Sequence, residues 1–236
     1  MNGTKRKILY FEELSSTNDY AKTLLNNKEN VVVIAEKQTG GRGTKGRSFD
    51  SSKGGIYLTS LTFYEDFPAK DAFLIMARTA VAVCKTLEEF SLTPVIKWSN
   101  DVYVSDKKIC GILIENVFSG NKISSSVVGV GLNVNNALPD YLKEIATTMR
   151  EELNGEVDVK EVEEILLKNI LEPFKMEEYT KRVGYLNRPL TLTMNEKVFQ
   201  AVAIRVEEDG GLIVLINGEE KKVYSGEVSL SVRTEK

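Results

Sequence analysis

A loop rich in glycine and positive charge carries the clearest chemical signal in the sequence. Gln38–Arg47 reads QTGGRGTKGR and combines four glycines with the cations Arg42, Lys45 and Arg47. Glycines let backbone N–H groups approach a ligand closely, and guanidinium groups pair with carboxylates and phosphates. The loop therefore predicts an anion site, although a flexible surface connection could have the same composition.

Three further polar clusters interrupt apolar segments. Ser16-Thr17-Asn18 could cap a helix, bind a polar ligand, or do both, because a helix N-terminus has free N–H groups. Lys97–Asp101 (KWSND) places a cation, the single tryptophan, an amide and a carboxylate in one turn, with Lys108 shortly after. A structural corner around Trp98 and a surface ion pair between Asp101 and Lys108 are the simpler readings.

The last cluster joins Gly111–Glu115 (GILIE) to Gly129–Asn133 (GVGLN). A single Gly-x-Gly is weak evidence for dinucleotide binding, and the rest of the dinucleotide-binding fingerprint is missing. Small residues here indicate close approach of a ligand or of another backbone.

The chain has no histidine, which excludes Ser–His–Asp and Cys–His mechanisms and zinc sites that use histidine. The clusters supply cations, hydrogen-bond donors and a carboxylate for Mg²⁺. This set suits attack of a carboxylate on a nucleotide phosphate, in which positive groups must hold two anions together. Lys108, Arg42 and Mg²⁺ are the candidates for that role.

Composition narrows the class of protein further. The 236 residues carry a net charge of −3, which argues against bulk nucleic-acid binding. Cys84 and Cys110 lie in apolar segments and are expected to be buried free thiols. No signal peptide or membrane-spanning run is evident, so we expect a cytoplasmic protein with no membrane partner.

The elements that must position these clusters follow from hydrophobic periodicity. We expect two domains, a mixed α/β domain over residues 1–183 and a small all-β domain over 184–236. Helices are expected from Ser16, Pro68 and Val159 and over Tyr141–Met149. Strands are expected at Ile8–Phe11, Val31–Ala35, Gly55–Phe63, Pro94–Lys97, Asp101–Val104, Lys108–Phe118 and Lys122–Val130. Five short strands follow Gly184, and Asn217-Gly218 predicts a tight hairpin between two of them.

The sequence resembles the biotin–protein ligase (biotin–[acetyl-CoA carboxylase] ligase) family over nearly its whole length. The matching segments run in the family's order: SSTN at 15–18, EKQTGGRGTKGRSF at 36–49, GGIYLTS at 54–60, KWSNDVY at 97–103, KICGILIE at 108–115, GVGLNV at 129–134 and GEVSL at 226–230. The resemblance implies an α+β fold: a mixed, mainly antiparallel sheet backed by helices, similar to class II aminoacyl-tRNA synthetases, plus a C-terminal SH3-like β-barrel.

The resemblance also implies a two-step reaction. Biotin and MgATP would give biotinyl-5′-AMP, and a lysine of a biotin carboxyl-carrier domain would then accept the biotin. By family pattern, the biotin-binding residues would be Ser16, Thr17, Asn18, Gln38, Arg42, Gly43, Thr44 and Lys108. ATP or the adenylate would contact Arg42, Arg47, Trp98, Lys108 and Asn133. The catalytic residues would be Lys108, Arg42 and Asp101, and Asp101 would also be the Mg²⁺ ligand.

Two positions depart from the family pattern. Thr44 stands where the family loop commonly has a second arginine, which predicts looser retention of the adenylate unless Lys45 or Arg47 compensates. Ser99 replaces a usual proline, with little effect expected on chemistry. Some family members carry an N-terminal DNA-binding domain; here the first strand comes at once, so we expect a form that lacks it and does not act as a repressor.

Alternatives remain open at this stage. A lipoate–protein ligase would use the same fold and the same adenylation chemistry. A nucleic-acid-binding module could use the loop as an Arg/Gly patch, although the net charge opposes it. An inactive protein could hold biotin without ATP, which Lys108 and Asp101 argue against. Family members often form homodimers, and the sequence leaves that open.

Overall fold

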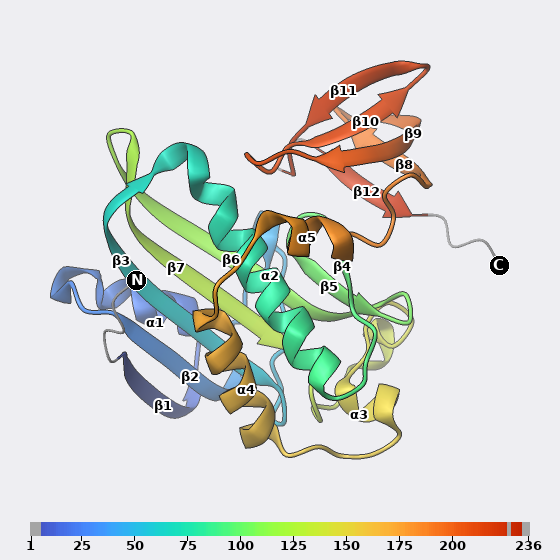
Figure 1. Ribbon diagram of the computed structural model, residues 1–236. Coiled ribbons are helices and arrows are strands. Elements are labelled where there is room, and N and C mark those ends of the chain that lie inside the picture. Colours follow the sequence, from blue (N-terminus) through green and yellow to red (C-terminus); the bar gives the residue numbers. More distant parts are fainter. Residues whose placement is uncertain (1–5, 226–227, 233–236) are drawn as a thin grey trace.

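Two β-sheets organise the chain in the computed structural model, which describes residues 6–225 and 228–232 (Figure 1). The large sheet has seven strands in the order β1-β2-β3-β7-β6-β5-β4, and the small sheet has five in the order β11-β10-β9-β8-β12. The large-sheet strands are β1 Lys7–Leu14, β2 Val31–Gln38, β3 Ile56–Pro68, β4 Val95–Lys97, β5 Asp101–Val104, β6 Lys107–Ser119 and β7 Lys122–Leu132.

The large sheet is mixed but mainly antiparallel, as expected. Only β1 and β2 pair in parallel, because α1 (Thr17–Thr23) forms the crossover between them. The pairs β2–β3, β3–β7, β7–β6, β6–β5 and β5–β4 are antiparallel. The register sets Gly129 opposite Thr59 and Gly131 opposite Gly111, which brings the glycine cluster into the middle of the sheet.

Helices cover both faces of this sheet. In Figure 1, α2 (Ala72–Glu89) and α4 (Val159–Leu171) cross one face, while α1 lies behind it. Strand β2 serves both layers: Val32 and Ile34 join the core under α2, whereas Val31 and Val33 pack with Ala21 of α1. A strand buried on both faces explains the unbroken apolar run in the sequence.

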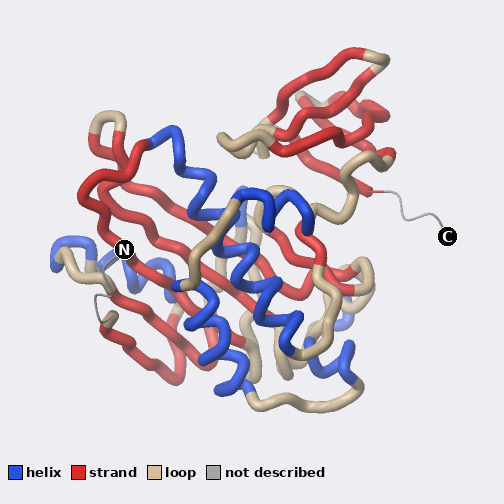
Figure 2. The backbone as a smooth tube through the Cα atoms, in the orientation of Figure 1, coloured by secondary structure: helices blue, strands red, loops and turns tan. Residues whose placement is uncertain are grey.

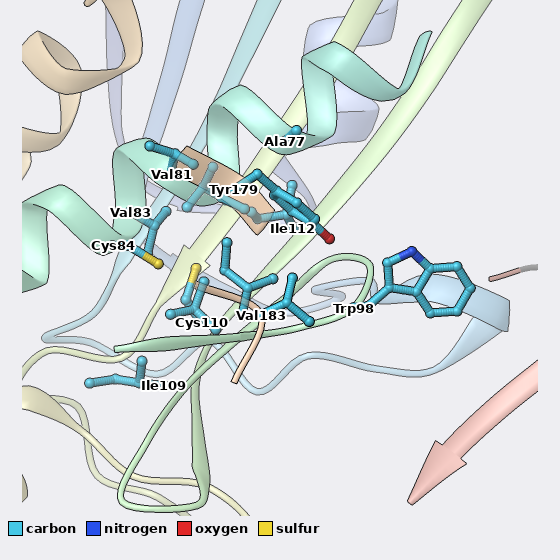
Figure 3. Packing of buried hydrophobic residues seen from close by; sticks show 14 of the residues in the cluster. Ala77, Val81, Val83, Cys84, Trp98, Ile109, Cys110, Ile112, Tyr179 and Val183 are labelled. Atoms are coloured by element: carbon cyan, nitrogen blue, oxygen red, sulfur yellow. The ribbon is translucent and has the colours of Figure 1, made fainter. Parts of the chain in front are cut away.

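The core beneath α2 contains both cysteines (Figure 3). Cys84 of α2 and Cys110 of β6 are buried free thiols, as expected. Burial raises the pKa of Cys84 to about 12 and raises that of Cys110 further. Both are therefore neutral packing groups and not nucleophiles.

The prediction of a helix over Tyr141–Met149 is wrong. A short 3₁₀ turn, Asp140–Leu142, is followed by a further turn at residues 143–145 and an isolated β-bridge at Ala146, and α3 occupies Met149–Leu153. The amide of Lys108 donates to the carbonyl of Ile145 at 2.9 Å, and the amide of Thr147 donates to the carbonyl of Lys108 at 2.9 Å. Pairing with the start of β6 thus overrides helical periodicity here, and it also fixes the backbone of Lys108.

Other expected elements are confirmed with small shifts at their ends. The helix expected from Pro68 begins with a 3₁₀ turn, Ala69–Asp71, before α2. Helix α4 ends at Leu171, two residues before Pro173, in keeping with the helix-ending effect of proline. The short α5, Met176–Arg182, was not anticipated from the sequence.

The described residues from Pro189 onward form strands and turns, as Figure 2 shows. Its strands are β8 Pro189–Met194, β9 Lys197–Val206, β10 Leu212–Ile216, β11 Glu219–Val223 and β12 Val228–Val232. Asn217 and Gly218 have φ of 52° and 87° and join β10 to β11, which confirms the hairpin. Within the described residues, no helix is long and apolar enough to cross a membrane.

Candidate active site

One cleft gathers residues from all four polar clusters of the sequence. Every residue expected to bind biotin lines it: Ser16, Thr17, Asn18, Gln38, Arg42, Gly43, Thr44 and Lys108. Phe49, Asn100, Gly111, Gly129 and Gly131 also line it, and the sequence had given them no individual role. The cleft lies on the α1 face of the sheet, beside the strands where β3, β7 and β6 meet.

The inner wall of the cleft is a buried network of hydroxyl and amide groups. The Ser16 hydroxyl caps α1 by accepting from the amide of Asp19 at 3.3 Å. The amide and hydroxyl of Thr17 both donate to Oε1 of Gln38, at 2.8 and 3.0 Å. The Thr59 hydroxyl donates to Oδ1 of Asn18 at 2.6 Å. Capping and ligand binding are therefore compatible, because Ser16 caps the helix while Thr17 and Asn18 stay oriented at the cleft.

Glycines on the floor of the cleft make room for these polar groups. A Cβ added at Gly129 would collide with Oδ1 of Asn18, and one at Gly131 would come within 2.6 Å of the Phe49 ring. Any larger residue would have to displace a lining side chain. The Gly-x-Gly of β7 thus serves close packing across the sheet surface, as the sequence indicated, and not a dinucleotide turn.

Arg42 is held at the entrance of the cleft by two acidic side chains. Its Nη2 donates to Oδ1 of Asp19 at 2.6 Å and to Oε2 of Glu115 at 3.2 Å. Glu115 also accepts from Nζ of Lys22 at 2.7 Å and from Nδ2 of Asn18 at 3.1 Å. Burial opposes ionisation of Glu115, but the hydrogen bonds from Lys22 and Asn18 outweigh it, so its pKa lies below the usual value.

Lys108 reaches the other side of the cleft and is paired with Asp101. Its Nζ lies 2.8 Å from Oδ1 of Asp101 and 5.7 Å from the centre of the Phe49 ring. Asp101 also accepts from Nδ2 of Asn100 at 3.1 Å. The Lys108 side chain is 29% exposed and that of Asp101 is 17% exposed, so the ammonium group remains within reach of a ligand.

Lys97 adds a second cation close to Asp101. Its Nζ donates to the Tyr103 hydroxyl at 3.3 Å and lies 5.0 Å from the centre of that ring. Burial lowers the pKa of Lys97; Asp101 opposes this shift, and Arg47 adds to it. Lys97 is therefore a second cation near the Lys108–Asp101 pair, although it does not line the cleft itself.

Three of the residues expected near the nucleotide do not line the cleft. Arg47 donates to Thr44, from Nη2 to Oγ1 at 3.1 Å and from Nε to the carbonyl at 3.3 Å. Trp98 is buried and donates from Nε1 to the carbonyl of Gly210 at 2.9 Å. Asn133 is buried and donates from Nδ2 to the carbonyl of Thr147 at 3.1 Å. Figure 3 shows the Trp98 ring at the rim of the core, away from Cys84 and Cys110.

The cleft is narrow in this conformation. It encloses about 40 Å³, far less than the roughly 300 Å³ at which typical ligand pockets begin. The side chain of Arg42 spans it toward Asp19 and Glu115. A ligand larger than this volume therefore requires the cleft to widen.

Sequence reasoning missed the partners that hold the ligand-facing groups in place. Thr59 is fully buried in β3, and the polar pair Thr59-Ser60 within that buried strand was the available signal. The sequence did not predict that Asp19 and Glu115 pair with Arg42. Their pairing with Arg42 depends on the packing of α1 against β6 and could not be read from spacing.

Fold and site together define a class of protein: an α+β domain with a cationic, glycine-rich loop over a cleft for a small anionic ligand, followed by a small β domain. Two family models match in that order. The Biotin/lipoate A/B protein ligase family matches residues 10–133, and the Biotin protein ligase C terminal domain matches residues 185–231. The chain belongs to the Biotin/lipoate A/B protein ligase family.

Individual relatives agree over most of the chain. The bifunctional ligase/repressor BirA of Bacillus subtilis is 32% identical, with 94% of this chain and 74% of that protein covered. BirA of Escherichia coli is 26% identical over 92% of this chain and 72% of its own. The structure of biotin protein ligase from Aquifex aeolicus in complex with biotin and ATP matches with a TM-score of 0.78 at 28% identity, covering 96% of this chain and 99% of that one.

Proposed function

We propose that this protein is a biotin–protein ligase, which activates biotin with ATP and transfers it to a lysine of a biotin carboxyl-carrier domain. The observation that carries the proposal is that three separate parts of the chain converge on one cleft: Thr17, the loop residues Gln38 and Arg42, and Lys108. The relatives named above support the choice of biotin and ATP.

In the first step, a carboxylate oxygen of biotin attacks the α-phosphorus of ATP, and pyrophosphate leaves. Thr17, Asn18 and Gln38 would orient the polar ring of biotin through their hydroxyl and amide groups. Lys108 would lie between the carboxylate and the α-phosphate and reduce their mutual repulsion. Arg42 would close over the carboxylate after leaving Asp19 or Glu115.

In the second step, the neutral amine of the acceptor lysine attacks the carbonyl of the mixed anhydride. The bond between the carbonyl carbon and the phosphate oxygen breaks, AMP leaves, and the amine loses a proton. Asp101 is the carboxylate nearest to Lys108 and would bind or orient an ammonium group at this position.

Mg²⁺ would enter with ATP as the bound metal of the nucleotide. Among the described residues there is no cluster of three His, Cys, Asp or Glu side chains that could hold a metal. Mg²⁺ commonly takes one or two protein carboxylates and fills its remaining positions with phosphate oxygens and water. A single carboxylate such as Asp101 fits that arrangement, and the ion would neutralise phosphate charge there.

The decisive experiment is incubation with biotin, MgATP and a carrier domain, followed by intact-mass measurement. We expect the carrier to gain one biotinyl group with wild-type protein and none with Lys108→Ala. Lys107→Ala is the matched control, because Lys107 is the adjacent lysine and donates to the carbonyl of Lys143 outside the cleft. Lipoate offered in place of biotin tests the other ligase class, and preferential transfer of lipoate would reject biotin as substrate.

We also infer that the protein has no nucleic-acid partner, and salt-dependent binding to generic RNA would contradict this. A homodimer could form along β1, the outer strand of the large sheet, where Ile8 and Tyr10 are exposed. Sedimentation of wild type and Tyr10→Glu would show whether this edge is used.

A further inference from the structure

Ser51 is a buried residue that contacts a side chain of the cleft without lining the cleft itself. It lies in the segment that leads from the glycine-rich loop to β3. Its hydroxyl accepts from Nε2 of Gln38 at 2.9 Å, and its carbonyl accepts from the backbone amide of Gln38 at 3.0 Å. Ser51 therefore holds both the main chain and the side chain of a residue that lines the cleft.

The hydrogen bonds around the Gln38 side chain fix which way its amide points. The single proton of the Ser51 hydroxyl is donated to the carbonyl of Phe49 at 3.0 Å, and a carbonyl can only accept. The Ser51 oxygen therefore accepts from Gln38, which must present its nitrogen there. At the other end of the amide, the backbone N–H of Thr17 can only donate, and it donates to Oε1 of Gln38 at 2.8 Å. Two independent contacts thus give the same orientation.

In this orientation the Gln38 amide has one hydrogen-bonding group left for a ligand. Its Oε1 accepts from both the amide and the hydroxyl of Thr17, which occupies both lone pairs of the oxygen. Its Nε2 carries two N–H groups, and Ser51 accepts from one of them. No residue that the structure describes accepts from the other. Gln38 therefore offers the cleft a donor, and the ligand atom beside it must be an acceptor.

The start of the glycine-rich loop packs directly on this contact. A Cβ added at Gly41 would lie 2.5 Å from Oγ of Ser51 and 3.2 Å from Nε2 of Gln38. The amide of Phe49 donates to the carbonyl of Gly41 at 2.9 Å, which holds the two ends of the loop together. The Ser51 hydroxyl is thus enclosed by its partners, and a methyl group in its place would leave Nε2 of Gln38 without that acceptor.

We propose that Ser51 is a positioning residue for biotin, because its hydroxyl holds the Gln38 amide with one N–H available to the ligand. The inference rests on the proposed function, since biotin is the ligand that Gln38 would meet. With the hydroxyl present, the donor is already oriented before the ligand arrives, and little conformational freedom is lost on binding. Without it, Thr17 alone anchors the amide, and the nitrogen is free to turn away from the ligand.

The first test is calorimetric titration of the full chain with biotin. We expect Ser51→Ala to weaken binding at least about fivefold. Ser126→Ala is the matched control: Ser126 is also buried and donates to Oδ1 of Asn116 at 2.6 Å, but it faces the other side of β7 from Gly129. It should bind biotin as wild type does. Ser51→Cys keeps the size but bonds weakly, and it takes the place of Ser51→Ala should that variant fail to fold.

A double-mutant cycle separates positioning from a purely structural role. If Ser51 acts through Gln38, Ser51→Ala should change biotin binding by less than about twofold in a Gln38→Ala background. The KM for ATP should stay within about twofold of wild type, because Gln38 would contact biotin and not the nucleotide. Equal weakening in both backgrounds, or undiminished biotin binding by folded Ser51→Ala, would overturn this inference alone. Absence of biotin binding by wild type would reject the proposed function, and this inference with it.

Discussion

At the scale of single residues, we expect Thr44 to limit how firmly the loop holds an anionic intermediate. Thr44 lines the cleft, and Arg47 donates to its hydroxyl at 3.1 Å, so the nearest guanidinium is engaged with the loop itself. We predict that Thr44→Arg slows release of the biotinyl adenylate at least about tenfold, because each charge-assisted hydrogen bond contributes roughly 1.5–3 kcal/mol. Stopped-flow measurement of adenylate release tests this.

A neutral variant separates charge from side-chain length at this position. Thr44→Gln extends the side chain without adding a cation and should release the adenylate about as fast as wild type. Equal release rates for wild type and Thr44→Arg would mean that Arg47 or Lys45 already supplies the missing charge.

Glu115 gives the entrance of the cleft a predictable pH dependence. Its pKa in the folded protein lies below the ordinary 4.5, so its contribution to stability is present above that pH and is lost as the pH falls through the folded value. The side chain is a third exposed, which limits the gain. We predict that Glu115→Gln lowers the free energy of unfolding at pH 7 by about 0.5–1 kcal/mol. Urea titrations should show this difference shrinking below pH 4.5, and a difference that grows in acid would contradict the assignment.

At the scale of elements, the fit between α1 and β7 depends on a missing side chain. Gly129 leaves room for Asn18, whose Oδ1 accepts from the buried Thr59. We predict that Gly129→Ala weakens biotin binding at least about tenfold and costs about 1–3 kcal/mol of stability, because Asn18 must move from its partners. Gly155→Ala is the control, since no atom lies within 4 Å of a Cβ there. Titration calorimetry with biotin and thermal melts measure both effects, and similar behaviour of the two variants would refute the prediction.

The sequence predicted elements well where local pattern and packing agree. Val159–Leu171 was expected as a helix and is one, because its apolar stripe packs against α2. The prediction failed at Tyr141–Met149, where pairing of Ile145 and Thr147 with Lys108 overrides a helical pattern. Contacts between distant segments also limited the prediction of the site. The types and order of residues indicated that Gln38 and Lys108 belong to it. The ion pairs of Arg42 with Asp19 and Glu115 form only when α1, the loop and β6 pack together, so the sequence did not predict them.

At the scale of the whole molecule, Trp98 links the two sheets. It follows β4 in the large sheet, and its Nε1 donates to the carbonyl of Gly210, in the turn before β10. Its amide donates to the Tyr185 hydroxyl at 2.9 Å, and Gly210 also packs against Phe73 at the start of α2. The motif that leads to Asp101, the ion-pair partner of Lys108, is thus also the attachment point of the C-terminal β domain, so hydrogen bonds bridge the boundary proposed near residue 183.

Trp98→Phe tests whether this residue serves attachment or, as the family pattern implied, the nucleotide. Phenylalanine keeps an apolar ring but leaves the Gly210 carbonyl without its donor, which should cost about 1–3 kcal/mol. We predict faster amide exchange at residues 209–214 than in wild type, unchanged exchange in β3 and β7, and a KM for ATP within about twofold of wild type. Hydrogen exchange read by mass spectrometry and steady-state kinetics measure these quantities. A clear rise in KM for ATP with unaltered exchange at 209–214 would instead place the indole at the nucleotide.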